Sequence, residues 1–338
     1  MPATSFQKEA LKALKAPFER SCRRKVTEDC AFVLFRKKHD RRKLDGCFEY
    51  KTKEEKTMTF AYKITIVGLG LIGGSLAMAL RGLQNTSIVG YDNNPDVLAK
   101  ARKLGVANFV VSDVKLALSN ADLVIICIYP DGITPFLREN LQYLKSGAII
   151  TEVCGVKEKL AAEIREILPN DIDYVGIHPM AGKEIEGIDV AEATLFQGTG
   201  FILTPLETSK PQNIELLESL ARHVGATRIA TTTPKKHDEI IAYTSDLMHI
   251  ASAALCLDYH HEMTNAFTAG AFRDCTRIAR INPELWSELF LANKEYTLHE
   301  IDRFLGSVNA LRSAVANGDK SELQKLLHRV RENKEKMG

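Results

Sequence analysis

The stretch KITIVGLGLIGGSLAMAL, residues 63–80, decides the fold. It opens with a short β-rich run at 63–67 and continues as an apolar helical pattern over 75–83. Between them Gly68, Gly70 and Gly73 form the pattern GxGxxG. The first glycine permits a tight turn, the second lets the backbone approach a pyrophosphate, and the third packs helix on strand. The pattern alone is weak, but a strand before it and a helix after it predict a dinucleotide-binding domain of the Rossmann type.

An acidic residue in the right place predicts which dinucleotide binds. Asp92 ends the next predicted strand, 24 residues after Gly68, where a carboxylate accepts a hydrogen bond from the ribose 2′-hydroxyl. Asn93, Asn94 and Pro95 follow, with no arginine for a 2′-phosphate, so NAD is favoured over NADP. We expect the first helical turn to supply N–H donors to the phosphates. The predicted cofactor-binding residues are therefore Gly68, Gly70, Leu71, Ile72, Gly73 and Asp92.

Strands and helices alternate as far as residue 233, which predicts a parallel, doubly wound sheet. The expected strands are 63–67, 87–92, 109–112, 122–130, 148–154, 174–178, 200–205 and 227–232. The expected helices are 75–83, 94–105, 114–121, 135–144, 156–168 and about 211–223.

The pattern changes after Pro234, where almost no β signal remains. Long helical patterns occupy 237–261 and 283–318, so we expect an all-α domain over 234–338. These helices carry more apolar surface than one small bundle covers, which favours a homodimer through this domain. The predicted fold is thus an α/β Rossmann-type domain at 61–233, followed by an all-helical domain for substrate binding and dimerisation.

The first 60 residues differ in charge from the rest. They hold 16 Lys and Arg against 9 Asp and Glu, whereas the remaining 278 residues hold 29 against 34. A basic run at 36–43 could contact nucleic acid, but a solvated tail is the better interpretation because the segment has little apolar periodicity. We expect residues 1–60 to be a poorly ordered leader, 1–57 to be dispensable, and Met58 to be a natural start.

Composition narrows the class of protein further. The 338 residues are 45% hydrophobic and 26% charged, as in ordinary globular proteins. No apolar run approaches the roughly 20 residues of a membrane span, and no signal peptide is recognisable. The seven cysteines form no CxxC pair, so we expect no metal site, no disulfide framework and a reducing, cytoplasmic location. Neither nucleic acid nor membrane is an expected partner.

A candidate catalytic base stands at the end of a predicted strand. In YVGIHPMAGKE, residues 174–184, His178 follows a buried β pattern and precedes Pro179 and a turn of small residues. Functional residues cluster on loops at strand ends, and the crevice of a Rossmann sheet lies at the carboxyl ends of its strands. Histidine has an unperturbed pKa suited to a base near neutral pH.

Four motifs in order resemble the prephenate/arogenate dehydrogenase family of tyrosine biosynthesis. They are GLGLIGGSLAMAL, IHPMAGKE, HDEIIAYTSDLMH and FRDCTRIARINPELW, and the resemblance spans about 62–335. It implies an NAD-dependent oxidoreductase of aromatic amino acid biosynthesis. The expected reaction is oxidative decarboxylation of prephenate to 4-hydroxyphenylpyruvate. The alternative is arogenate dehydrogenase, which gives tyrosine directly.

The resemblance also assigns roles to individual residues. His178 matches the family's catalytic histidine, and Arg277 matches an arginine that binds a substrate carboxylate. His249 and Glu184 match substrate-binding positions, Glu184 near the pocket mouth. Arg273 and Arg280 are nearby candidates, and both are better interpreted as solvated helix arginines. Trp286 matches a family aromatic residue, for which core packing is the simpler interpretation.

Two departures from the family pattern bear on specificity. Gly155 stands where many members carry a serine, and Asp246 replaces the first histidine of an SHLPH-like segment. An added carboxylate near the pocket could raise the pKa of His249 and favour a substrate with an amino group. Asp246 therefore keeps the arogenate alternative open.

Two other functions are less consistent with the sequence. A reductase of the β-hydroxyacid dehydrogenase type shares the architecture but needs a catalytic lysine, for which we see no motif. An NAD-sensing dimer with a dead site is disfavoured because His178 and Arg277 are both present.

Overall fold

The computed structural model describes residues 48–51, 57–60, 62–183, 185–257 and 266–337. The chain divides into two compact units, Met1–His237 and Asp238–Gly338. Within the expected leader, β1 (Phe48–Lys51) and β2 (Thr57–Phe60) pair as an antiparallel two-stranded sheet.

The first unit is built on an eight-stranded sheet of strand order β10-β9-β8-β7-β6-β3-β4-β5. The strand order reverses beside β3, as in doubly wound sheets whose ligand crevice lies at that point. The strands are β3 (Tyr62–Val67), β4 (Thr86–Tyr91), β5 (Phe109–Val111), β6 (Leu123–Ile126), β7 (Ile149–Glu152), β8 (Asp173–Met180), β9 (Gly200–Pro205) and β10 (Arg228–Thr231).

One strand pairing departs from the parallel sheet that the sequence predicted. All neighbours in the large sheet run parallel except β8 and β9, which are antiparallel from Val175 opposite Pro205 to Met180 opposite Gly200. The connection between them contains only the short 3-10 helix η2 (Ile188–Val190) among its described residues. A parallel strand requires a crossover, usually a full α-helix, so β9 runs back along β8 instead.

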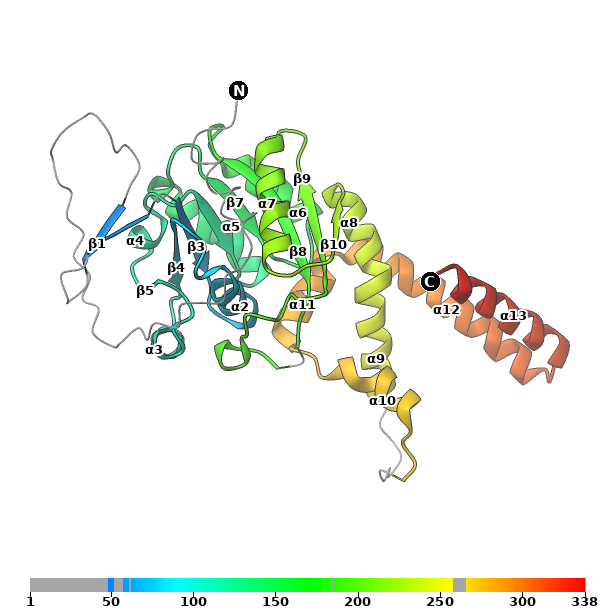
Figure 1. The fold of residues 1–338 in the computed structure, drawn as a ribbon. Coiled ribbons are helices and arrows are strands. Elements are labelled where there is room, and N and C mark those ends of the chain that lie inside the picture. The colour runs from blue at the N-terminus through cyan, green and yellow to red at the C-terminus, as the bar shows by residue number, and fades with distance from the viewer. Residues whose placement is uncertain (1–47, 52–56, 61, 184, 258–265, 338) are drawn as a thin grey trace. The chain divides into compact units, whose positions relative to one another are not determined.

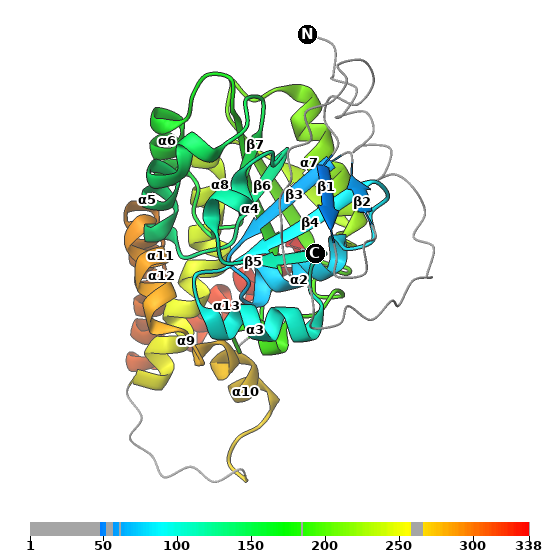
Figure 2. The same cartoon turned by 90° about the vertical axis from the view of Figure 1, so that its left-hand side faces the viewer.

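Helices cover both faces of the sheet (Figure 2). On one face, α2, α3 and α7 contribute buried residues to the main apolar core. On the other face, α5 and α6 pack against each other, and α6 packs on β8. The helices of this unit are α2 (Leu71–Leu80), α3 (Pro95–Leu104), α4 (Val114–Leu118), α5 (Pro130–Asn140), α6 (Glu158–Ile167) and α7 (Pro211–His223).

Two helices begin earlier than their apolar patterns predicted. Helix α2 starts at Leu71 instead of Ser75, inside the glycine turn itself. Helix α5 starts at Pro130 instead of Pro135, with the proline in its first turn, where a missing N–H costs nothing.

The second unit is all helical, as predicted. A continuous helical stretch crosses the unit boundary as α8 (Pro234–Ile241), a π-helical turn η3 (Ala242–Asp246) and α9 (Leu247–Leu257). It is followed by α10 (Gly270–Thr276), the 3-10 turn η4 (Arg277–Ala279), α11 (Pro283–Ala292), α12 (Lys294–Ala316) and α13 (Lys320–Lys336). The predicted helix over 283–318 is broken at Asn293, which separates α11 from α12. Helices α12 and α13 lie side by side (Figure 1).

The helical unit leaves many apolar side chains exposed. They include Tyr243, Met248, Leu255, Leu257, Phe304, Leu305, Val308, Val315, Leu327 and Val330. The stretch Pro234–Leu257 is also long and apolar enough to cross a membrane. A single helix of this kind is weak grounds for a membrane span, because core helices of soluble proteins share its length and composition.

Candidate functional site

The glycine turn after β3 has the geometry that a dinucleotide requires. Gly68 has φ +87°, and a Cβ there would lie 2.5 Å from the Cys127 carbonyl oxygen. A Cβ on Gly73 would overlap the Gly68 carbonyl oxygen, so α2 packs directly on the turn. A Cβ on Gly70, by contrast, would meet nothing within 4 Å. The space over Gly70 lies at the N-terminus of α2, where no side chain caps the first N–H groups, so the turn fits a pyrophosphate.

Asp92 lies beside this turn, directly after β4. Its Oδ2 accepts a hydrogen bond from the backbone N–H of Leu69 at 2.8 Å, and its Oδ1 accepts one from that of Asn94 at 2.9 Å. The carboxylate therefore holds the glycine turn against the end of β4. Each carboxylate oxygen can accept a further hydrogen bond, which suits the ribose hydroxyl role predicted for it.

His178 lies on the part of β8 that has separated from β7. Pairing between β7 and β8 is limited to Ile149–Asp173 and Ile150–Tyr174, whereas β8 continues along β9 as far as Met180. His178 is half-buried, while Ile177 and Pro179 on either side of it are buried. The strand thus holds the imidazole on a rigid edge and leaves part of the ring accessible.

The imidazole of His178 meets a second imidazole. Its Nδ1 lies 2.9 Å from Nε2 of His237, and the ring centroids are 5.1 Å apart. Burial lowers the pKa of His178 well below the usual value of 6.5, and the nearby His237 and Lys157 lower it further. His178 is therefore neutral at physiological pH, which a general base requires.

A buried polar network occupies the place where β7 and β8 part. The Nζ of Lys157 donates to both carboxylate oxygens of Glu152, at 2.7 and 2.8 Å, and to the Cys154 carbonyl at 2.7 Å. The Tyr174 hydroxyl donates to Glu152 at 2.9 Å, and the backbone N–H of Cys154 donates to it at 2.6 Å. Cys154 is buried as part of this loop.

Gly176 leaves the room that this network needs. A Cβ at Gly176 would lie 2.5 Å from Thr204 Oγ1, 2.9 Å from the Tyr174 hydroxyl and 3.1 Å from Glu152 Oε1. Because Glu152 and Lys157 are both fully buried, each charge depends on the other for compensation.

In the second unit, the structure brings three of the predicted residues together. His249 on α9 stacks on Trp286 of α11, with ring centroids 3.6 Å apart, and its Nδ1 donates to the Ser245 carbonyl at 3.0 Å. Burial lowers the pKa of His249, and the positive charge of Arg277 lowers it further. Arg277 is exposed at the start of η4. Trp286 is only half-buried, so its ring serves this stack as well as packing against Phe290.

The effect on the pKa of His249 that was considered for Asp246 was wrong. Asp246 is 2% exposed, and its Oδ2 accepts hydrogen bonds from Asn293 at 2.8 Å and Thr297 at 3.0 Å. It therefore faces the interior of the helical unit. The pKa of His249 is lowered rather than raised, and Asp246 is not among the groups that shift it.

Other predicted residues fall in different surroundings. Arg273 and Arg280 are exposed, as the solvated interpretation expected, and Glu184 lies outside the described residues. His237 was expected only to begin a helix, and no local sequence signal placed it beside His178. Its contact depends on the fold of β8 to β10, which brings together residues 59 positions apart.

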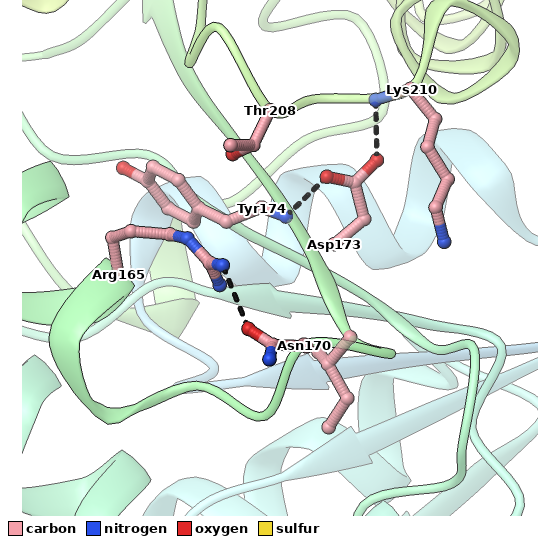
Figure 3. A pocket seen from close by; sticks show the side chains of 7 residues that line it. Arg165, Asn170, Asp173, Tyr174, Thr208 and Lys210 are labelled. Atoms are coloured by element: carbon pink, nitrogen blue, oxygen red, sulfur yellow. Dashed lines mark hydrogen bonds between the residues drawn. The ribbon is translucent and has the colours of Figure 1, made fainter.

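A hollow at the opposite end of β8 is structural. It has a volume of about 30 Å³, roughly that of one water molecule, and Figure 3 shows its lining. Asp173 accepts hydrogen bonds there from the backbone N–H groups of Tyr174 and Lys210 and from the Asn213 side chain. Arg165 donates to Asn170. The hydrogen bonds of Asp173 tie the start of α7 to the start of β8.

Together, the dinucleotide-binding turn, the neutral strand-end histidine and the following helical unit define an NAD-dependent dehydrogenase of two domains. The sequence models of two domains of one protein family match adjacent parts of the chain. The prephenate dehydrogenase nucleotide-binding domain matches residues 76–230, and the prephenate dehydrogenase dimerization domain matches residues 233–329. The chain belongs to the prephenate dehydrogenase family.

Individual relatives agree with this assignment. The prephenate dehydrogenase of Bacillus subtilis (strain 168) is 32% identical over 272 residues, 77% of this chain and 72% of that protein. The cyclohexadienyl dehydrogenase of Zymomonas mobilis is 33% identical, over 78% of this chain and 91% of that protein. The crystal structure of Aquifex aeolicus prephenate dehydrogenase with hydroxyphenyl propionate and NAD⁺ has a TM-score of 0.74 and 28% identity, covering 82% of this chain and 98% of that one.

Proposed function

We propose that the protein catalyses the NAD-dependent oxidative decarboxylation of prephenate to 4-hydroxyphenylpyruvate, with His178 as the base. The observation that carries this proposal is the neutral, half-buried imidazole of His178 on a rigid strand edge of a dinucleotide-binding domain. Family membership supports the substrate.

The reaction assigns one task to His178. Its free imidazole nitrogen takes the proton of the substrate hydroxyl as the C–O bond gains double-bond character. NAD⁺ held at the glycine turn would supply the hydride acceptor for the carbon that carries the hydroxyl. The ring carboxylate leaves as CO₂, the electron pair of the broken C–C bond completes the aromatic ring, and protonated His178 returns its proton to the ring oxygen, which becomes the phenol hydroxyl. No other proton acceptor is needed in this sequence.

Arg277 and His249 are the proposed substrate-binding residues of the helical unit. Arg277 offers an exposed guanidinium, which binds a carboxylate in a bidentate manner that lysine cannot reproduce. His249 has its Nδ1 proton committed to Ser245, so its Nε2 is left as an acceptor. Glu184 is proposed as a further substrate-binding residue on the family resemblance alone.

The cofactor residues are proposed from the turn geometry. Gly68 and Gly73 shape the turn, Gly70 leaves space for the pyrophosphate, and the N–H groups of Leu71 and Ile72 face it as first-turn donors. Asp92 is proposed to accept the ribose hydroxyl.

We further propose a cytoplasmic homodimer that associates through the helical unit. The exposed apolar side chains of that unit and its match to a dimerization domain support this assembly. Light scattering coupled to size-exclusion chromatography should give about twice the 37.6 kDa chain mass. A monomer at micromolar concentration would contradict it.

The first test is the initial rate of NADH formation with prephenate and with arogenate. We expect a clear preference for prephenate, because Asp246, the residue that raised the arogenate alternative, faces inward. A preference for arogenate would overturn the proposed substrate while leaving the family unchanged.

Two substitutions test the residue roles. His178→Asn should lower kcat by about 10²- to 10⁴-fold, the contribution of a general base, with little change in NAD⁺ affinity. Arg277→Ala should raise KM for prephenate by about 10- to 100-fold, since a hydrogen bond to a charged group contributes about 1.5–3 kcal/mol. Arg273→Ala, another exposed arginine of the same segment, is the matched control and should leave KM near the wild-type value.

A further inference from the structure

The contact between His178 and His237 determines which ring nitrogens carry protons as well as how the rings are placed. A hydrogen bond between two imidazole nitrogens 2.9 Å apart needs one N–H donor and one lone pair. His178 Nδ1 and His237 Nε2 are therefore in opposite states, and only two arrangements of the protons are possible for the neutral pair. In one, His178 donates from Nδ1 and keeps a lone pair on Nε2. In the other, His178 carries its proton on Nε2.

The base role selects between these arrangements. Because Nδ1 of His178 is engaged by His237, Nε2 is the nitrogen that a substrate can reach. Nε2 can accept a hydroxyl proton only if its lone pair is free, so the proton of neutral His178 must be on Nδ1. Nε2 of His237 then accepts this proton, and His237 carries its own proton on Nδ1.

Burial and the hydrogen bonds of a helix start hold His237 in place. It is 1% exposed, on the first turns of α8, and its backbone N–H donates to the Thr233 carbonyl at 2.9 Å. The Thr233 hydroxyl accepts from the Lys236 N–H at 3.2 Å as a helix cap, and Pro234 begins the helix. A capped helix start directly after β10 therefore holds the imidazole against β8.

Burial and the neighbouring groups favour a neutral His178. Among the described residues, the titratable side chains that face His178 or the network beside it include His237 from α8, Lys157 before α6, Glu152 from β7, Tyr174 from β8 and Cys127 near Glu152. The positive charge of Lys157 opposes a second proton on His178. When His178 takes the substrate proton, its Nδ1–H bond to neutral His237 becomes charge-assisted and therefore stronger.

We infer that His237 is a positioning residue for the base: it accepts the Nδ1 proton of His178 and so presents the Nε2 lone pair to the substrate hydroxyl. This inference rests on the proposed role of His178 as the base. It gives a neutral histidine the orienting function that a carboxylate has in many acid–base sites.

Two variants separate hydrogen bonding from packing. His237→Met fills similar space without an acceptor for the Nδ1 proton. His237→Gln places an amide oxygen near the position of Nε2 and retains an acceptor. We expect kcat to fall by about 10- to 100-fold in His237→Met, less than loss of the base itself, and to stay within about threefold of wild type in His237→Gln. NAD⁺ affinity should be unchanged in both.

NMR can determine which ring nitrogen of His178 carries the proton, independently of any activity measurement. Long-range ¹H–¹⁵N NMR spectra of the NAD⁺-bound enzyme, labelled with ¹⁵N-histidine and assigned by the loss of signal in His178→Asn, show which ring nitrogen carries the proton. We expect the Nδ1–H form in wild type and in His237→Gln, and a mixture in His237→Met. His328→Met, an exposed histidine on α13, is the matched control for both measurements and should behave as wild type.

The outcomes distinguish the inference from the proposed function. An Nε2–H form of His178 in the wild-type enzyme, or equal losses of kcat in His237→Gln and His237→Met, would overturn the positioning role. Retained turnover in His178→Asn would instead remove the base role itself. If His237→Met fails to fold, the wild-type spectrum and His237→Gln still decide the question.

Discussion

The buried carboxylate of Asp246 should make the stability of the helical unit depend on pH. The pKa of Asp246 is raised from 3.8 to about 6, chiefly by burial and to a smaller extent by the nearby Asp238, against the opposing effect of hydrogen bonds from Asn293 and Thr297. The folded protein therefore binds a proton more tightly than the unfolded chain. The stabilisation from this proton is fully present below pH 3.8 and is lost as the pH rises through about 6.

Asparagine at this position removes the titration and keeps the acceptor. The Oδ1 of an asparagine can accept the two hydrogen bonds that Asp246 now accepts, and its amide adds a donor beside Asn293, whose buried Oδ1 has no partner among the described residues. Given about 1.4 kcal/mol for each pH unit of pKa difference, ionising Asp246 in the folded state costs about 2–3 kcal/mol. The free energy of unfolding of Asp246→Asn should therefore rise by about 2–3 kcal/mol relative to that of wild type as the pH increases from 4 to 7.

Equilibrium denaturation in urea at fixed protein concentration measures this difference. Unfolding free energies of wild type and Asp246→Asn would be compared at half-unit steps from pH 4 to pH 7.5, and Asp302→Asn, an exposed carboxylate on α12, serves as the control. A difference between wild type and Asp246→Asn that stays constant within about 0.5 kcal/mol across this range would refute the reasoning, because an unburied or fully compensated carboxylate would give that result.

Three further predictions concern the first unit. Gly176→Ala should destabilise the protein by about 1–3 kcal/mol through overpacking. Adding Thr204→Ala to that variant should restore part of the lost melting temperature, because it removes the nearest clashing atom, 2.5 Å from the new Cβ. An unchanged melting temperature in Gly176→Ala alone would contradict this packing. Gly73→Ala should weaken NAD⁺ binding at least about tenfold in calorimetry by displacing the turn, whereas Gly132→Ala, whose Cβ would meet its nearest neighbour at 3.5 Å, should bind normally. Lys157→Met should cost about 3–5 kcal/mol in denaturant unfolding by leaving a buried carboxylate unpaired, and a loss below about 1 kcal/mol would show that water compensates it.

Local patterns in the sequence were sufficient for the domain order and the cofactor turn. Gly68, Gly70 and Gly73 lie in one turn of six residues, and the spacing of such a turn is visible in the sequence, so all three could be identified from spacing. The Cys127 carbonyl that a Cβ on Gly68 would meet is distant in the chain and could not be predicted. Alternating strand and helix patterns likewise determined the class of the sheet, since one-dimensional periodicity reports which faces are buried. His178 could be proposed because it ends a strand.

Tertiary structure alone decided what surrounds His178. The antiparallel return of β9 and the capped start of α8 bring His237 to its Nδ1, and the early separation of β7 from β8 encloses the Glu152–Lys157 pair. The sequence could not place these groups, because a histidine at a helix start and a lysine after a strand look like ordinary surface residues until the distant segments pack against them. The inward direction of Asp246 has the same origin: it is set by Asn293 and Thr297 on the far side of the helical unit, about 50 positions along the chain. Contacts within one turn or strand can be read from the sequence, whereas the protonation and orientation of a functional side chain depend on neighbours that only the folded chain supplies.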